Sequence, residues 1–218
     1  MVTINRINVK NEILNFIRNE NIISSTLRGV ETRTETFNVL NSTPTLTLAE
    51  DGVKNIRQVD VDGTIYTAFE QYNILNLNTR DKTQIEFLTS ISGNTISVEY
   101  DYGIGDKIYA DFPQDFITID SFPRIGFDIV NIETESLSFS DDYYQKSLVF
   151  EFRVLSKSED VEIIAQNLYD ALFNNRKDFF YTTFMRPQDI SSKALIDSTS
   201  NKIFGVSMRF VAPTQYEN

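Results

Sequence analysis

The sequence predicts an α+β fold: a mostly antiparallel sheet with helices on one face, interrupted by a small all-β, sandwich-like insertion. Three observations lead to this prediction. Residues 147–155 alternate between apolar and polar side chains, as a strand with one buried face does. Residues 161–172 then repeat apolar residues at the spacing of an amphipathic helix. Residues 42–107 hold several short strand-like runs separated by turn signals, which is typical of a small sandwich or barrel.

The sequence of the N-terminal part predicts one helix followed by an extended segment. We expect the helix over residues 9–20 and the extended chain over residues 21–40. The helix needs a sheet to cover its apolar side, so we assign it to the same domain as the C-terminal part. The predicted organisation is a discontinuous domain of residues 1–41 and 108–218, with the β domain of residues 42–107 inserted into it. The apolar side of the helix consists of Ile13, Leu14, Phe16 and Ile17.

Turn signals predict two hairpins in the insertion. Asp62-Gly63 is the strongest two-residue hairpin signal, and it joins the strands predicted at residues 56–61 and 64–69. A second hairpin is expected between residues 83–91 and 95–102. In its second strand one face consists of Ile96, Val98, Tyr100 and Tyr102.

Two long strands and a helix form the centre of the C-terminal part. Residues 125–134 and 147–155 are predicted to pair as antiparallel neighbours, joined by an acidic and aromatic loop. Ser158 is the expected N-cap of the following helix, and acidic residues in the first turn suit the positive end of its dipole.

The last forty residues predict two further strands with an irregular segment between them. Residues 178–184 and 203–211 are the expected strands, and the polar residues 187–201 are expected to be irregular. In the final strand one face consists of Phe204, Val206, Met208 and Phe210.

Composition excludes several classes of function. The 218 residues contain 20 basic and 31 acidic residues, a net charge of -11, which argues against a surface that grips nucleic acid. With no cysteine and no histidine, the chain has no thiolate nucleophile, no cysteine metal site and no histidine general base. We therefore expect no catalytic residues and no metal-ligating residues in this chain.

The chain carries no signal peptide pattern and no apolar run long enough to cross a membrane. We expect a soluble protein with no membrane partner.

Two short motifs superficially match binding loops. Residues 103–106, Gly-Ile-Gly-Asp, resemble part of a glycine-rich phosphate loop but lack its third glycine, so a tight turn is the better interpretation. Residues 60–63, Asp-Val-Asp-Gly, match the start of a calcium loop without its closing glutamate. A hairpin turn explains them, with a weak surface cation as the alternative.

Arg124 follows Pro123 directly before a predicted strand. A catalytic or ligand-binding arginine is one interpretation. A structural ion pair with Asp128 or Glu133 is the favoured one.

Residues Asp141, Asp142, Tyr143 and Tyr144 are the candidate functional residues of this chain. A carboxylate pair for glycosidic chemistry is disfavoured because adjacent acids in one loop point in different directions. A solvated connection between strands is the simplest interpretation. The alternative is a subunit-contact loop, because exposed tyrosines bury amphipathic area at low entropic cost.

Three segments resemble the tail-terminator (tail-completion, neck) proteins of long-tailed viruses of bacteria and archaea. They are residues 122–131 (FPRIGFDIVN), 147–158 (SLVFEFRVLSKS) and 161–172 (VEIIAQNLYDAL). The order of parts is similar over roughly residues 1–40 and 108–218. The shared motifs are patterns of fold and not catalytic signatures.

The resemblance implies a structural virion protein, made in the host cytoplasm, that assembles as a ring, typically a hexamer. Such a ring caps the tube of tail-tube protein, ends tube growth and joins the tail to the head–tail connector and neck proteins, while DNA passes without specific binding. The family has no cofactor and no active site. The β domain at residues 42–107 is larger than the usual hairpin there. The alternatives are therefore a tail- or neck-associated binding module, whose β domain contacts sheath, glycan or another virion protein, and a carboxylate-dependent hydrolase.

Overall fold

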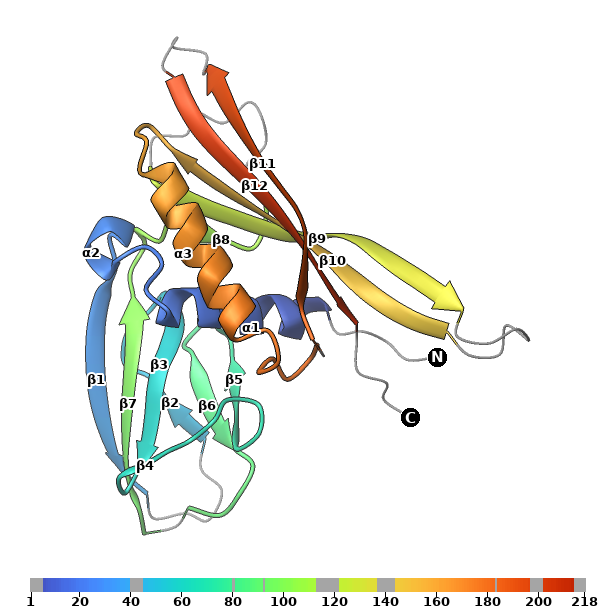
Figure 1. Cartoon of the computed structure of the whole chain (residues 1–218). Helices are drawn as coiled ribbons and strands as arrows, with labels where there is room; N and C mark the ends of the chain where they lie inside the picture. Colours follow the sequence, from blue (N-terminus) through green and yellow to red (C-terminus); the bar gives the residue numbers. More distant parts are fainter. Residues whose placement is uncertain are drawn as a thin grey trace. The chain divides into compact units, whose positions relative to one another are not determined.

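The computed structural model of this chain is rich in antiparallel sheet and contains few helices (Figure 1). Contacts divide the chain into two compact units. Unit 1 comprises Met1–Ile23 and Lys107–Asn218, and unit 2 comprises Ser24–Asp106. The structure describes residues 6–39, 45–79, 81–91, 93–112, 122–136, 144–182, 184–196 and 202–213.

Unit 1 contains a five-stranded sheet in the order β11-β12-β10-β9-β8. All neighbours are antiparallel except β8 and β9, which pair in parallel through two residues of each strand. The predicted pairing of the two long strands is confirmed. The strands are β8 (Ile108–Tyr109), β9 (Arg124–Ser136), β10 (Tyr144–Ser156), β11 (Arg186–Ile196) and β12 (Lys202–Pro213), and the helices are α1 (Arg6–Asn19) and α3 (Val161–Asn174).

One core cluster joins both helices of unit 1 to a single face of β9, β10 and β12. Alternation explains this, because Phe152 lies opposite Phe127 in β9 and Met208 in β12, and all three side chains are buried. The aromatic rings of Phe127 and Phe152 stack at 5.5 Å, and Phe210 meets Phe152 edge to face. The buried side chains of α3 are those predicted from its periodicity: Val161, Ile164, Ala165, Leu168, Ala171 and Leu172.

The start of α3 differs from the prediction. Its N-cap residue is Asp160, and the Asp160 carboxylate accepts hydrogen bonds from the hydroxyls of Ser156 and Ser158 instead of capping a backbone N–H. The expectation of Ser158 as N-cap was therefore wrong, because its hydroxyl is already used in this cluster.

Two of the predictions for the end of the chain were also wrong. Residues 178–182 form no strand, and β11 covers Arg186–Ile196, where an irregular segment was expected. Most of the described side chains of β11 are exposed, so its sequence lacks the apolar alternation that reveals half-buried strands. The last strand is confirmed, with Val206, Met208 and Phe210 buried together.

Unit 2 contains two sheets whose inward side chains form one core cluster, a sandwich-like arrangement. The larger sheet has the order β1-β7-β3-β4 and the smaller has the order β2-β6-β5. Its elements are α2 (Ser25–Arg28), β1 (Glu31–Asn38), β2 (Thr45–Thr47), β3 (Val53–Val61), β4 (Thr64–Ile65), β5 (Tyr72–Leu75), β6 (Gln84–Phe87) and β7 (Thr95–Tyr102).

The first boundary between the units lies at residue 23, and the predicted boundary at residue 41 was wrong. The reason is that β1 pairs with β7 along its whole length, from Glu31 with Tyr102 to Asn38 with Thr95. The second boundary, between residues 106 and 107, lies one residue before the expected position.

Of the two predicted hairpins in unit 2, one is confirmed. Asp62 and Gly63 both have positive φ, as a type I′ turn requires, and they join β3 to β4. The second hairpin was wrong, because β6 pairs with β2 and β5 while β7 pairs with β1 and β3. The chain around Gly93 thus passes from one sheet to the other.

Candidate interaction surface

Of the four residues of the predicted subunit-contact loop, the structure describes only the backbone of Tyr144. Asp141, Asp142 and Tyr143 lie outside the described residues, and Tyr144 is the first residue of β10, with nothing described of its side chain. The assignment of these four residues to subunit contact stays a prediction.

The five-stranded sheet of unit 1 has two open edges. Within the described residues, no strand pairs with the outer side of β11, and β8 covers β9 only at Ile125 and Gly126. Farther along β9, the Arg6 guanidinium donates a hydrogen bond to the Ile129 carbonyl at 2.9 Å. Beyond that point Ile132 is 40% exposed, and on β11 Ile190 is 55% exposed. Unpaired edges with exposed apolar side chains are typical sites for pairing with another chain.

A shallow groove of about 260 Å³ lies between α3 and the β11–β12 ribbon. Its apolar lining includes Tyr169 from α3, Ile190 from β11 and the buried side chains of Val206 and Met208 from β12. On the helix, the lining residues follow one another at helical spacing, so they form a single stripe beside the stripe that enters the core. The groove is lined by Glu162, Ala165, Gln166, Tyr169, Ile190, Ser192, Val206 and Met208.

An aromatic cluster continues from this groove at the C-terminal end of α3. The rings of Tyr169 and Phe173 stack at 5.8 Å. The Arg176 guanidinium lies 4.2 Å from the centre of the Phe173 ring and 5.4 Å from that of Phe184, and it donates a hydrogen bond to the Phe173 carbonyl at 2.6 Å. Phe173 and Phe184 are both exposed. Arginine beside exposed aromatic rings is the composition typical of interface hot spots.

Glu12 anchors the loop between Arg176 and Phe184. Its carboxylate accepts hydrogen bonds from the backbone N–H groups of Phe180 and Tyr181. Burial raises the pKa of the Glu12 carboxyl, and the two N–H donors offset only part of that shift. This use of Glu12 is structural.

The other face of the sheet carries a charged triad. The buried Glu151 carboxylate accepts hydrogen bonds from Arg153 Nε at 2.7 Å and from Arg209 Nε and Nη2 at 3.0 and 2.9 Å. Burial alone would raise the pKa of the Glu151 carboxyl, but hydrogen bonds and charges from the two arginines outweigh it and hold that pKa below its usual value. About half of each arginine side chain is exposed, and the cross-strand neighbours of this triad are acidic, Asp128 beside Glu151 and Asp189 beside Arg209.

Arg124 does not make the predicted ion pair with Asp128 or Glu133. Its guanidinium lies over the Tyr109 ring at 4.2 Å, and burial lowers its pKa. Asp128 pairs with Lys10 of α1 instead. The prediction failed because the partners of Arg124 and Asp128 come from segments distant in sequence.

The turn at residues 103–106 has a structural explanation. A Cβ on Gly105 would lie 2.1 Å from the Gly29 carbonyl oxygen, so the two backbones can approach only because this residue is glycine. Asp106 Oδ1 lies 3.2 Å from Nε of Arg28, which is completely buried. Burial lowers the pKa of Arg28, and the charges of Asp106 and Asp101 oppose that shift. The glycines and the aspartate therefore have structural partners within unit 2.

The carboxylates at residues 60–63 are occupied by turn contacts. Asp60 Oδ1 accepts from the Gly63 N–H at 2.6 Å, and Asp62 accepts from Asn94 Nδ2 at 2.6 Å and from the Thr95 N–H at 2.9 Å. These bonds fix the hairpin. Across the described ranges, no group of three or more acidic side chains is arranged to hold a metal ion.

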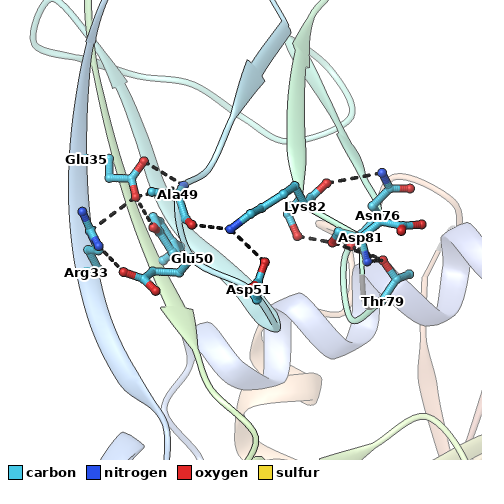
Figure 2. Close-up of polar contacts among 11 residues, drawn as sticks. Arg33, Glu35, Ala49, Glu50, Asp51, Asn76, Thr79, Asp81 and Lys82 are labelled. Carbon is cyan, nitrogen blue, oxygen red and sulfur yellow. Dashed lines mark hydrogen bonds and ion pairs between the residues drawn. The ribbon is translucent and has the colours of Figure 1, made fainter.

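Figure 2 shows a polar cluster on unit 2 whose residues form hydrogen bonds and ion pairs with one another. Glu35 accepts from the Ala49 N–H at 3.1 and 3.2 Å, and Arg33 pairs with both Glu35 and Glu50. The Lys82 ammonium lies 2.8 Å from Asp51. The cluster ties the segment before β3 to β1 and to the loop before β6. The carboxylates of Glu35, Glu50 and Asp51 have cationic or N–H partners, so their role is structural.

No helix in the described part of the chain is long and apolar enough to cross a membrane. No protein-family model matches the sequence, and no curated protein matches it either.

Sequence reasoning missed the open edge of β11, the groove and the buried Arg28. For β11 the Pro187 and polar residues indicated a loop, although proline near the start of a strand is typical of edge strands and was a usable signal. The cluster of Phe173, Arg176 and Phe184 was visible only as scattered aromatic residues.

Proposed function

We propose that this chain is a structural virion protein that forms a ring, of hexameric type, at the neck-proximal end of a viral tail. In this role it ends growth of the tail tube and joins the tail to the head connector. The observation that carries the proposal is the five-stranded sheet with open edges on both sides, β11 on one and the outer part of β9 on the other. A contact between two different edges is heterologous, which is the type that generates rings.

The segments that resemble tail-terminator proteins support the same proposal. They correspond to the start of β9, to β10 and to α3, which are the central elements of unit 1. In the proposal, unit 1 is an α+β ring-forming domain with its helices on one face of the sheet. Unit 2 is an inserted domain that contacts sheath or another virion protein.

The charge of the chain suits a channel through which DNA passes. With a net charge of -11, the chain repels phosphate, so DNA moves past it without specific binding. The proposal involves no cofactor and no reaction, and the virion is its proposed location.

The test is to add the purified chain to growing tubes of the tail-tube protein of the same virus. We expect tubes of limited length with a ring at one end, seen by negative-stain electron microscopy. Tubes of unchanged length with no chain at their ends would refute the proposal. Specific binding of a cell-surface polysaccharide by the full chain, in place of tube binding, would favour the alternative of a glycan-binding module.

A further inference from the structure

We infer that neighbouring copies of this chain join by antiparallel pairing between the outer edge of β11 in one copy and the outer edge of β9 in the next. The inference rests on the proposed function and deepens it, because it names the contact that would close the ring. Each copy then extends the sheet of its neighbour.

The two open edges have similar regular lengths. On β11 a bulge lies between Pro187 and Asp189, and from Asp189 to Ile196 the strand pairs with β12 without interruption. On β9 the register shift falls beside Val130, and from Asn131 to Ser136 the strand pairs regularly with β10. Bulges and proline protect an edge only where they occur. The regular stretches beyond them are the parts able to take a further strand.

The backbone of β9 is oriented for such pairing. The Ile132 N–H donates to the Asn131 side-chain oxygen at 2.9 Å. This N–H therefore points away from β10, toward the open edge. The side-chain bond is local and can be exchanged for a bond to a partner strand.

Strand directions fit a closed ring. From β11 to β12, to β10 and to β9, each neighbour is antiparallel, so β9 and β11 run in opposite directions within one copy. In a cyclic ring with strands along its axis, all copies keep the same direction. The β11 edge of one copy therefore meets the β9 edge of the next in the antiparallel sense, which gives the more stable ladder.

Side chains at the two edges are complementary. Ile190 of β11 and Ile132 of β9 are both exposed and both lie on the helix-bearing face of the sheet, because they pair with Met208 and Leu148. A continuous sheet brings such side chains together on one face. Contact between them removes apolar surface from water.

Charge on the opposite face disfavours pairing of two β9 edges. Glu133 is exposed on that face of β9. On β11, exposed Asp189 lies on that face opposite Arg209 of β12, and exposed Arg186 lies on it before the bulge, outside the regular stretch. Pairing of two β9 edges would bring Glu133 residues of two copies together, which is unfavourable. The strand directions, the similar regular lengths and the two exposed isoleucines are the grounds for taking the β9 edge of a second copy as the occupant of the β11 edge.

The absence of cysteine from the chain allows a clean cross-linking test. Ser192→Cys is combined with Thr134→Cys on the helix-bearing face, and Ser191→Cys with Glu133→Cys on the other face. The second pair and a third, Ser192→Cys with Ile132→Cys, test one register on opposite faces, and this register is shifted by two residues from that of the first pair. Opposed Cβ atoms in an antiparallel pair lie about 4.5–5.5 Å apart, close enough for a disulfide after small shifts.

We expect at least one double variant to form covalent multimers larger than dimers on a non-reducing gel, with the matching single variants staying monomeric. Dimers of the Ser192→Cys or Ser191→Cys single variant would instead show pairing of two β11 edges and overturn the inference. No multimer from any double variant, with an oligomer seen by light scattering and a ring by negative-stain electron microscopy, would also overturn it while leaving the proposed function intact. A chain without any oligomer would refute both.

Edge charges provide a second measurement. Ile190→Lys and Ile132→Lys should each raise the dissociation constant of the oligomer by about tenfold or more, because a lysine on either edge blocks strand addition. The control is Ile163→Lys, which introduces the same charge at an isoleucine of α3 that is 66% exposed. Equal weakening by all three variants would contradict the contact, and circular dichroism checks that each variant is folded.

Discussion

Replacing Arg28 by methionine tests how unit 2 is held together. Arg28 is 0% exposed, and its Nε and Nη2 lie 3.2 Å from Asp106 Oδ1 and 3.3 Å from Asp101 Oδ2. Its Nη2 also lies 3.4 Å from Asn55 Oδ1. Breaking a buried ion pair by removing one partner costs about 3–5 kcal/mol. Because Asp101 keeps two bonds from Arg57, at 2.7 and 2.8 Å, we expect a loss of about 3 kcal/mol, the lower end of that range.

The matched control is Arg33→Met on β1 of the same unit. The Arg33 side chain is 44% exposed, and ion pairs of exposed side chains contribute little to stability because water and salt screen them. The assay is guanidinium denaturation of the full chain followed by circular dichroism, with the free energy of unfolding compared among the three proteins. Equal losses in Arg28→Met and Arg33→Met would refute the reasoning, because burial would then not decide the cost.

Three further predictions follow from single sites. Glu151→Gln should destabilise the chain by about 1.5–3 kcal/mol at neutral pH. The lowered pKa of Glu151 contributes stability that is present above the ordinary value of 4.5 and is lost as the pH falls through the folded pKa. The difference between variant and wild type should therefore shrink below pH 4.5 in denaturation series at stepped pH, and a constant difference would contradict this. Gly105→Ala should cost more than about 3 kcal/mol, because its Cβ would lie 2.1 Å from a backbone carbonyl oxygen, whereas Gly63→Ala should cost about 1–2 kcal/mol for its positive φ alone. Thermal melts rank the two, and the reverse order would be inconsistent with the close approach. Burial raises the pKa values of Tyr72 and Tyr100, so in an ultraviolet titration these two should ionise only when the chain unfolds. Phenylalanine at either position should remove one late-titrating group, and ionisation of every tyrosine near the ordinary value would exclude the buried assignment.

Elements with a half-buried face could be predicted from the sequence. The strand β10 and the helix α3 were found because burial on one side imposes a period of two or of about 3.6 residues. The turn at Asp62-Gly63 was found because positive φ at two successive positions requires such residues.

Pairing between distant strands could not be predicted in the same way. The alternation of β1 indicates a strand but not its partner. We therefore placed β1 in the domain of residues 1–41 and 108–218, whereas its pairing with β7 places it in unit 2. The strand β6 was expected to pair with β7, its neighbour in sequence, whereas it pairs with β2 and β5. An exposed edge such as β11 has no buried face, so its sequence carries no apolar period.

The candidate interaction surface was only partly accessible to sequence reasoning. The segment at residues 141–144 was selected by composition, whereas the open edges follow from the strand order. The ion pair of Arg28 with Asp106 joins residues 78 positions apart in the chain, and no local pattern indicates such a partner.

Light scattering coupled to size-exclusion chromatography tests the central claim, that this chain is a ring-forming subunit, most directly. The chain has a mass of 25.1 kDa, and the measurement is made over a range of protein concentrations with enough salt to screen its net charge. We expect one oligomer, near six times the monomer mass, that appears as a ring by negative-stain electron microscopy. A constant mass of 25.1 kDa at every concentration, also after addition of tail tubes, would contradict the claim.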